Sequence, residues 1–231
     1  MTRPRLLDLF CCAGGAGMGY QLAGFDVTGV DIDPQPDYPF TFHRGDALAF
    51  VAAHGREFDA IHASPPCQTH SPVSNLSRRT RRRELPDLLP QTRAALLAVG
   101  RPYVIENVHT RSAALAAPLV SCGAMFGLDV YRHRGFETCL PLLAVPPHPR
   151  HTRRVTRNGY LPTPDAPVMT ITGRNGHHAK AWQRKAAEVM GTPWITGLNQ
   201  VCEAIPPAYT RFLGEQLRDH LTHHTERRTA A

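Results

Sequence analysis

The feature that most constrains this chain is a recurring order in which short apolar runs end at glycines, acids or prolines. Five of these runs have the length and composition of buried strands: 5–10, 26–33, 40–47, 58–66 and 102–108. Segments with helical character alternate with them or follow them: 18–25, 85–100, 179–191 and 206–224. Strands that alternate with helices predict an α/β fold with a mostly parallel sheet and helices on both faces.

Candidate catalytic or ligand-binding residues stand at the end of each of these runs. They are Gly14–Gly17, Asp31, Asp46, Cys67 and Glu106. In open α/β sheets, ligands bind outside the carboxyl ends of the strands. The gathering of such residues at one edge of the sheet therefore predicts an enzyme.

The stretch DLFCCAGGAGMG forms a glycine-rich turn between the first predicted strand and a helix. Glycines allow the backbone to approach a ligand closely, and the helix N-terminus supplies N–H donors. Asp31, at the end of the next strand, is placed to bind ribose hydroxyls. Together they indicate a cofactor with an adenosine moiety, either a dinucleotide or S-adenosylmethionine. The alternative is a tight turn with a structural role only.

Cys67 lies in the stretch ASPPCQTHSP, directly after Pro65 and Pro66. Prolines restrict their own backbone and that of the preceding residue, so this loop is stiff. A core cysteine would not need that brace, and a metal ligand would have only His70 nearby, so a nucleophile is favoured. An arginine run follows, which would favour the thiolate and bind phosphates unless it is simply a solvated loop: Arg78, Arg79, Arg81, Arg82 and Arg83.

Glu106 ends an apolar strand, so burial should raise the pKa of its carboxyl and equip it as a proton donor. The alternative is a turn that caps the next element. Arg132 and Arg134 alternate within a further expected strand, 129–137, and so should share one face, with His133 pointing away. Two such arginines suit a phosphate or a base oxygen, although charge on an edge strand would look the same.

Composition limits the partners and the setting. The net charge is +7 and the sequence pI about 9.4, which is compatible with a nucleic-acid partner or with an arginine-rich source. No apolar run approaches membrane-spanning length, and the N-terminus lacks a secretory pattern, so a cytoplasmic location is expected. The six cysteines contain no CxxC pair and should be reduced thiols. The thirteen histidines are interpreted as surface residues, with no metal site.

The expected organisation has a catalytic core at 1–140 and a Pro-, Arg- and His-rich segment at 141–165. Strand character resumes at 166–176, within a stretch 166–222 that completes the catalytic domain. Residues 223–231 are expected to be a frayed tail, most clearly from Thr225 onward.

These motifs, in this order, resemble the DNA (cytosine-5)-methyltransferases. DLFCCAGGAGMG looks like the first motif of that family, VDID like its ribose motif, and GDA like the acid that contacts adenine. PPCQ matches the catalytic Pro-Cys-Gln motif, ENV the Glu-Asn-Val motif, and YRHRG the Gln-x-Arg-x-Arg motif. LNQVCEAIPPAYTRFLG resembles the closing motif. The resemblance covers 5–139 and about 166–217, and it implies a Rossmann-like S-adenosylmethionine-dependent methyltransferase fold.

Four departures from the family pattern matter. Cys12 stands where the family usually has its first glycine, and Val130 where the arginine motif has glutamine. Cys202 and Glu203 alter the closing motif, which leaves open a modified donor. The large target-recognition domain is replaced by the short 141–165 segment, as in small phage members, which implies a short or relaxed recognition sequence and a phage or mobile-element origin.

The resemblance implies roles for individual residues. Cys67 would add to carbon 6 of a cytosine flipped out of double-stranded DNA, Glu106 would hold or protonate N3, and carbon 5 would accept the methyl group. The implied catalytic set is Cys67, Glu106, Asn107, Arg132, Arg134, Pro66 and Gln68. The implied cofactor set is Asp8, Phe10, Gly14, Gly15, Gly17, Asp31, Ile32, Asp46, Pro65, Glu203 and Ala204. The implied DNA-binding set consists of the arginine run together with four further arginines: Arg150, Arg153, Arg154 and Arg157.

Several alternatives stay open on sequence grounds. The same chemistry on RNA or a nucleotide cytosine, a catalytically silent nucleic-acid binder and a nicotinamide-dependent oxidoreductase are the competing readings. A monomer is expected, with a dimer as the alternative. The recognition sequence and the biological role, whether restriction, self-protection or regulation, are not encoded in the motifs.

Overall fold

The computed structural model describes residues 2–66, 87–110, 114–140, 146–172 and 179–229. Within these residues a seven-stranded sheet has the order β3-β2-β1-β4-β5-β7-β6. The strands are β1 (Arg5–Leu9), β2 (Asp26–Asp31), β3 (Thr41–Arg44), β4 (Ala60–Ala63), β5 (Tyr103–Val108), β6 (Leu119–Ser121) and β7 (Arg134–Thr138). β1 to β5 run parallel to one another, and β7 runs antiparallel to both of its neighbours, β5 and β6.

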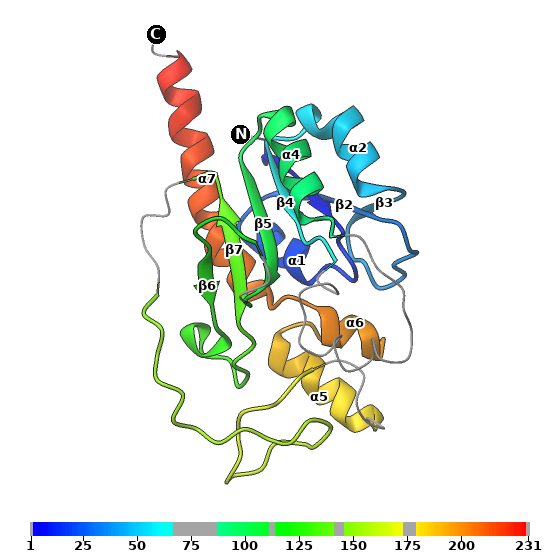
Figure 1. The fold of residues 1–231 in the computed structure, drawn as a ribbon, viewed down its shortest axis with the longest axis vertical. Helices are drawn as coiled ribbons and strands as arrows, with labels where there is room; N and C mark the ends of the chain where they lie inside the picture. The colour runs from blue at the N-terminus through cyan, green and yellow to red at the C-terminus, as the bar shows by residue number, and fades with distance from the viewer. Residues whose placement is uncertain (1, 67–86, 111–113, 141–145, 173–178, 230–231) are drawn as a thin grey trace.

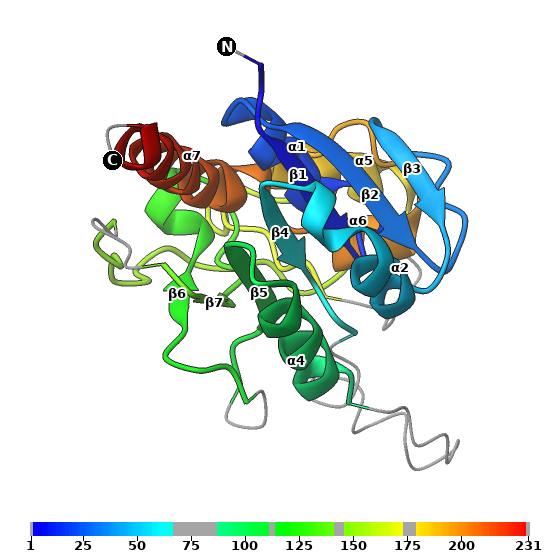
Figure 2. The same cartoon turned by 90° about the horizontal axis from the view of Figure 1, so that it is seen from above.

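The two faces of the sheet carry different helices (Figure 2). One face is covered by α1 (Gly15–Leu22) and the long α7 (Pro207–Thr229), which pack on each other. The other face is covered by α2 (Ala47–His54) and α4 (Leu89–Val99). α4 stops where Gly100 adopts a left-handed φ of 71°, as its sequence predicts. Helices on both faces of a mostly parallel sheet confirm the predicted fold class.

Each face buries its own apolar layer. Leu7 and Leu9 of β1 point toward Val51 of α2 and Leu96 of α4. Leu6 belongs to the opposite layer, with Tyr20, Phe25 and Leu217. Successive side chains of β1 are therefore buried on opposite faces of the sheet. This confirms that the continuous apolar run at the start of the chain is a fully buried strand.

The strand order fixes where a ligand can bind. From β1 the chain builds outward to β2 and β3, then returns to add β4 and β5 on the other side. The connections that leave β1 and β4 therefore diverge, and in doubly wound sheets ligands bind at the point where they do so. α5 (Lys180–Met190) and α6 (Leu198–Glu203) lie beyond this carboxyl edge (Figure 1).

Some sequence expectations need correction. Residues 166–172 form no regular strand; they make only isolated bridges, Val155 with Val168 and Thr163 with Ala166. The expected strand 129–137 begins at Arg134, because Arg132 adopts a left-handed φ of 22° that ends extended pairing. α7 continues to Thr229, so 223–229 is helical rather than frayed. α2, α6 and β6 were not anticipated.

No helix in the described ranges combines the length and the apolar character that crossing a membrane requires.

The packing of α1 on α7 predicts an intolerance of side chains at Gly19. A Cβ there would collide with Thr210 Oγ1 and the Pro207 carbonyl, which are held in place by α7. Gly19→Ala should therefore lower the free energy of unfolding by about 1–3 kcal/mol, the usual cost of overpacking. The matched control is Gly45→Ala, where a Cβ meets nothing within 4 Å. Urea unfolding of both variants tests this; equal midpoints would contradict it.

Candidate active site

The turn after β1 is a strained piece of backbone. Phe10 and Cys12 have left-handed φ angles of 56° and 44°, and Gly14 has one of 80°. Such conformations are costly for residues other than glycine and concentrate at functional sites. The Cys12 N–H donates to Asp31 Oδ2 at 3.0 Å, which ties the turn to the end of β2. Cys12 thus occupies a backbone conformation that glycine would accept more easily.

Asp31 and Ile32 offer two complementary surfaces beside this turn. Asp31 is buried and also accepts from the Asp33 N–H at 3.0 Å, so its carboxylate is held in one orientation. Ile32 is 66% exposed, which is unusual for a large apolar residue next to a buried acid. A fixed carboxylate next to an uncovered apolar side chain suits a ribose and its attached base. These residues fit the adenosine part of S-adenosylmethionine.

Asp46 caps the N-terminus of a helix. Its Oδ1 accepts from the Ala49 N–H at 2.8 Å, which caps the N-terminus of α2. The side chain is exposed, at the end of the β3–α2 connection. The structure therefore places Asp46 at the expected edge of the sheet and gives it a capping role; its predicted contact with adenine stays a prediction.

Asp8 lies beneath the glycine turn and is fully buried. Its Oδ2 accepts from the Tyr38 hydroxyl at 3.2 Å, and its Oδ1 has no hydrogen-bond partner among the described residues. Burial raises the pKa of this carboxyl to about 8, with Asp31 adding to the rise and Tyr38 opposing it. A Cβ on Gly17 would meet Asp8 Oδ2 at 2.8 Å, so glycine is needed there for the close approach.

The segment after α6 closes over the same turn. A Cβ on Gly15 would meet the Ile205 carbonyl at 2.5 Å and Ala204 Cβ at 3.4 Å. Glu203 lies close enough to Cys12 to raise the pKa of that thiol, although burial and Asp31 contribute more. The Trp194 indole N–H donates to the Ala13 carbonyl at 3.0 Å. The predicted closing residues therefore do lie on the turn, almost two hundred residues away in sequence.

Glu106 is the central acid of the second half of the site. It is buried on β5, and Arg134 Nε of β7 lies 3.1 Å from its Oε1. Burial raises the pKa of Glu106, while Arg134, a hydrogen bond from Ser64 and the charge of Arg132 oppose the rise. The net direction is upward, as predicted from its place at the end of an apolar strand. A buried carboxyl of this kind is suited to hold or donate a proton.

A buried polar chain behind Glu106 was missed by sequence reasoning. The Tyr20 hydroxyl contacts His62 Nδ1 at 3.0 Å, and His62 Nε2 contacts Ser64 Oγ at 2.9 Å. Ser64 in turn hydrogen-bonds Glu106. Burial lowers the pKa of His62 to about 3, so the imidazole is neutral. A histidine inside an otherwise apolar strand was the available signal.

Arg132 and Arg134, which were expected to act together on a phosphate or a base oxygen, have different partners. Arg134 pairs with Glu106, whereas Arg132 donates to the Cys202 carbonyl at 2.7 Å and the Ile171 carbonyl at 3.3 Å. Burial lowers the pKa of Arg132 to about 9, with Arg134 adding to the fall and Glu106 opposing it. Both arginines reach the Glu106 side, as predicted, but Arg132 mainly joins β7 to the closing segment.

Asn107 connects β5 to the proline loop. Its buried Nδ2 donates to the Pro65 carbonyl at 3.2 Å. Pro65 is buried and Pro66 exposed, directly before the predicted nucleophile. Cys67 and Gln68 lie outside the described residues, as does the arginine run: Arg78, Arg79, Arg81, Arg82 and Arg83.

The arginines of the short segment lie at the surface of the molecule. Arg150, Arg153 and Arg154 are exposed, on a stretch that passes below β6 and β7 in Figure 1. Arg153 pairs with Asp129 at 2.7 Å, and Arg157 lies over the Tyr160 ring at 5.6 Å. The structure therefore leaves most of this positive charge on the surface.

The chain is similar in sequence to one known methyltransferase and similar in fold to solved methyltransferase structures. No family model matches the chain. The type II methyltransferase M.XorII of Xanthomonas oryzae pv. oryzae is 33% identical over 152 residues, covering 59% of this chain and 31% of that protein. A candidate DNA modification methyltransferase from a prophage (E. coli) matches with a TM-score of 0.63 and 14% identity over 95% of this chain and 99% of that one.

A second solved structure agrees. The Dnmt2 methyltransferase of S. pombe matches with a TM-score of 0.61 and 13% identity, over 95% of this chain and 99% of that chain. The fold is that of a methyltransferase. The sequence match is to a type II methyltransferase, and the chain spans less than a third of the length of that protein.

The raised pKa of Asp8 predicts a pH-dependent stability. The ordinary value is 3.8 and the folded value about 8, so between these pH values the unfolded chain releases a proton that the folded chain keeps. Stability should fall as pH rises through that window. Asp8→Asn cannot ionise and should abolish this loss, whereas Asn at the exposed Asp26 should not. Urea unfolding at pH 5 and pH 8 measures it; an unchanged slope in Asp8→Asn would refute the assignment.

Proposed function

We propose that this chain is a DNA (cytosine-5)-methyltransferase. The observation that carries the proposal is the buried Glu106–Arg134 pair, which lies beside a proline loop held by Asn107. An acid with a raised pKa next to a guanidinium suits the N3 and O2 edge of a cytosine. The motif order and the similarity to a type II methyltransferase support the same reaction.

The cofactor proposed is S-adenosylmethionine. Asp31 would bind the ribose, and Ile32 and Phe10 would contact the adenine, with the turn Gly14–Gly17 closing beneath. When bound, S-adenosylmethionine supplies an electrophilic methyl group. The closing segment at Glu203 and Ala204 would cover this side of the site.

The reaction begins with the Cys67 thiolate adding to carbon 6 of the cytosine. Glu106 gives its proton to N3, so the negative charge that this addition creates is neutralised, and Arg134 holds the base edge. Carbon 5 is now an enamine carbon and accepts the methyl group. Loss of the carbon-5 proton to a base, return of the N3 proton to Glu106 and breakage of the carbon–sulfur bond restore the thiolate and the aromatic ring.

The substrate proposed is a cytosine rotated out of double-stranded DNA. A base inside the duplex cannot be approached from above and below its ring, so flipping is required for attack at carbon 6. The net charge of +7 and the exposed arginines at 150–157 would supply contacts to phosphates. The short segment leaves room for few base contacts, which favours a short recognition sequence.

The first experiment incubates the chain with S-adenosylmethionine and unmethylated duplex DNA, then measures 5-methylcytosine by mass spectrometry of nucleosides. Cys67→Ala should give no product, and Glu106→Gln, which cannot supply the proton, should lose about 10²–10⁴-fold in rate. Glu57→Gln, at an exposed acid far from the site, is the matched control. Product from Cys67→Ala at the parent rate would exclude the mechanism. Product on tRNA but not on DNA would transfer the proposal to RNA.

The Asn107–Pro65 hydrogen bond should affect catalysis more than binding. Asn107→Ala frees the proline loop, so the thiol loses its alignment with the base. Misplacement of about 1 Å can cost roughly 10²-fold in rate. We expect kcat to fall by that order while KM for S-adenosylmethionine changes little, as steady-state kinetics would measure. An equal rise in KM with unchanged kcat would show that Asn107 supports the cofactor site instead.

A further inference from the structure

Four side chains with metal-binding atoms converge between the β6–β7 region and the short segment. Cys122 follows β6 and is fully buried, and His133 precedes β7. His148 and His151 come from the short segment and are exposed. Cys122 Sγ lies 3.2 Å from His151 Nε2, and His133 Nε2 lies 3.0 Å from His148 Nε2. All four ligand atoms fall within 4.8 Å of one another.

These separations match those of a tetrahedral zinc site. With Zn–N bonds of about 2.0–2.1 Å and a Zn–S bond of about 2.3 Å, tetrahedral geometry places the ligand atoms roughly 3.3–3.6 Å apart. The two contacts are slightly shorter than this and all other pairs lie within 4.8 Å, so the four ligand atoms need only small movements to bind one ion. One thiolate and three imidazoles are also a donor set that zinc favours over calcium or magnesium.

The rings are oriented by their surroundings. The His151 ring stacks on Tyr131 with centroids 3.6 Å apart and an angle of 9° between planes. The Tyr131 hydroxyl donates to the Arg153 carbonyl at 3.0 Å, which fixes the stretch that carries His151. His133 and His148 are also nearly parallel, at 18°. These contacts limit the rotation of the His151 and His133 rings before any ion binds.

We propose that Cys122, His133, His148 and His151 bind one zinc ion with a structural role. Four protein ligands leave no open position for chemistry, as in structural zinc sites. The sequence alone indicates only scattered surface histidines without a cysteine partner. Sequence reasoning could not find this set, because ten and fourteen residues separate the first three ligands and only His148 and His151 are close in sequence.

The composition of residues 146–165 explains why a metal ion would be needed to hold this segment in place. Residues 146–165 have few apolar side chains, and Val155, Tyr160 and Leu161 are 51%, 61% and 46% exposed. The segment therefore cannot be held by a core of its own, and a metal site is a common substitute. The ion would join it to the β6–β7 region.

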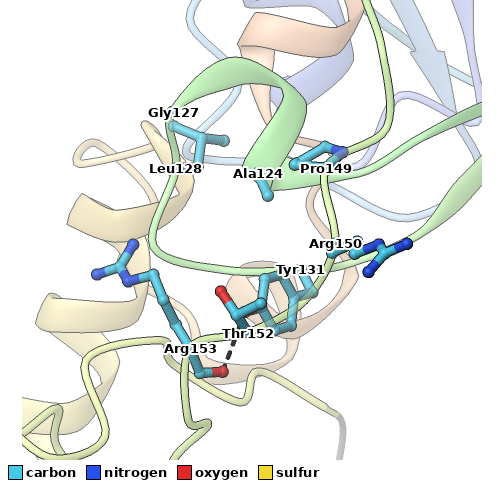
Figure 3. A pocket seen from close by; sticks show the side chains of 8 residues that line it. All are labelled: Ala124, Gly127, Leu128, Tyr131, Pro149, Arg150, Thr152 and Arg153. Atoms are coloured by element: carbon cyan, nitrogen blue, oxygen red, sulfur yellow. Dashed lines mark hydrogen bonds between the residues drawn. The ribbon is translucent and has the colours of Figure 1, made fainter.

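The zinc would also organise the arginine-bearing surface. Arg150 lies between His148 and His151, and Arg153 follows them. Figure 3 shows both arginines among the residues that line a cavity, together with Tyr131 and Pro149. The volume of this cavity is about 220 Å³. This role in presenting arginines to DNA rests on the proposed function, whereas the metal site itself does not.

The test measures bound metal in the full chain. After expression with zinc and removal of loosely bound metal on a chelating resin, elemental analysis should find about one zinc per chain. His148→Gln with His151→Gln, both at exposed positions, should lower this at least tenfold. His54→Gln, whose side chain is 49% exposed, is the matched control and should keep the zinc.

Cobalt substitution tests the ligand set independently. The cobalt-loaded chain should show the visible bands of tetrahedral coordination and a thiolate-to-cobalt charge-transfer band, and Cys122→Ser should lose the latter. Circular dichroism shows whether each variant is folded. A parent chain without zinc or cobalt would overturn the proposal, as would a folded His148/His151 double variant with its metal unchanged. Neither result depends on methyl transfer, so failure of the zinc site would leave the proposed reaction standing.

Discussion

The pairing of Glu106 with Arg134 is the interaction on which the rest of the site depends. β7 runs antiparallel to β5, with Arg134 opposite Val108 and Phe136 opposite Glu106. The acid and the guanidinium thus lie diagonally on one face of the two-stranded pair, close enough for direct contact. A buried carboxyl without that partner would be costly, and a guanidinium without the carboxyl equally so. The one reversed strand of the sheet is therefore what makes an acid at this depth tolerable.

The opposite half of the site depends on closure between distant parts of the chain. The left-handed turn at Phe10–Gly14 is tied to Asp31 through the Cys12 N–H, and Ile205 packs against Gly15. Arg132 then connects Cys202 and Ile171 to the strand that carries Arg134. The strain in the turn is tolerated because α7 and the closing segment pack over it. Cofactor-side and base-side residues are thereby parts of one packed unit.

Sequence reasoning could predict those parts of the fold in which local pattern and tertiary role agree. Asp31 and Glu106 end buried apolar runs, and parallel strands bring such ends to one edge. α2 escaped notice because ALAFVAAH is apolar on all sides and shows no stripe, although only Ala47 and Val51 are buried in it. The place of His62 inside an apolar strand indicates a buried imidazole, but its hydrogen bond with Tyr20 could not be predicted, because the two residues lie 42 positions apart. The split between Arg132 and Arg134 depends on a left-handed φ at Arg132 that alternation cannot reveal.

The buried strands and the 146–165 segment must be stabilised in different ways. Glu106 and Asn107 lie on the buried part of β5, so their positions are held by packing. The 146–165 segment cannot use the same means, because its prolines, arginines and histidines give it little apolar surface to bury. Hydrogen bonds from Tyr131 and the pair of Arg153 with Asp129 are exposed and individually weak. A metal bond is the kind of contact that can hold so polar a segment without removing its charge from the surface, where a polyanion would meet it.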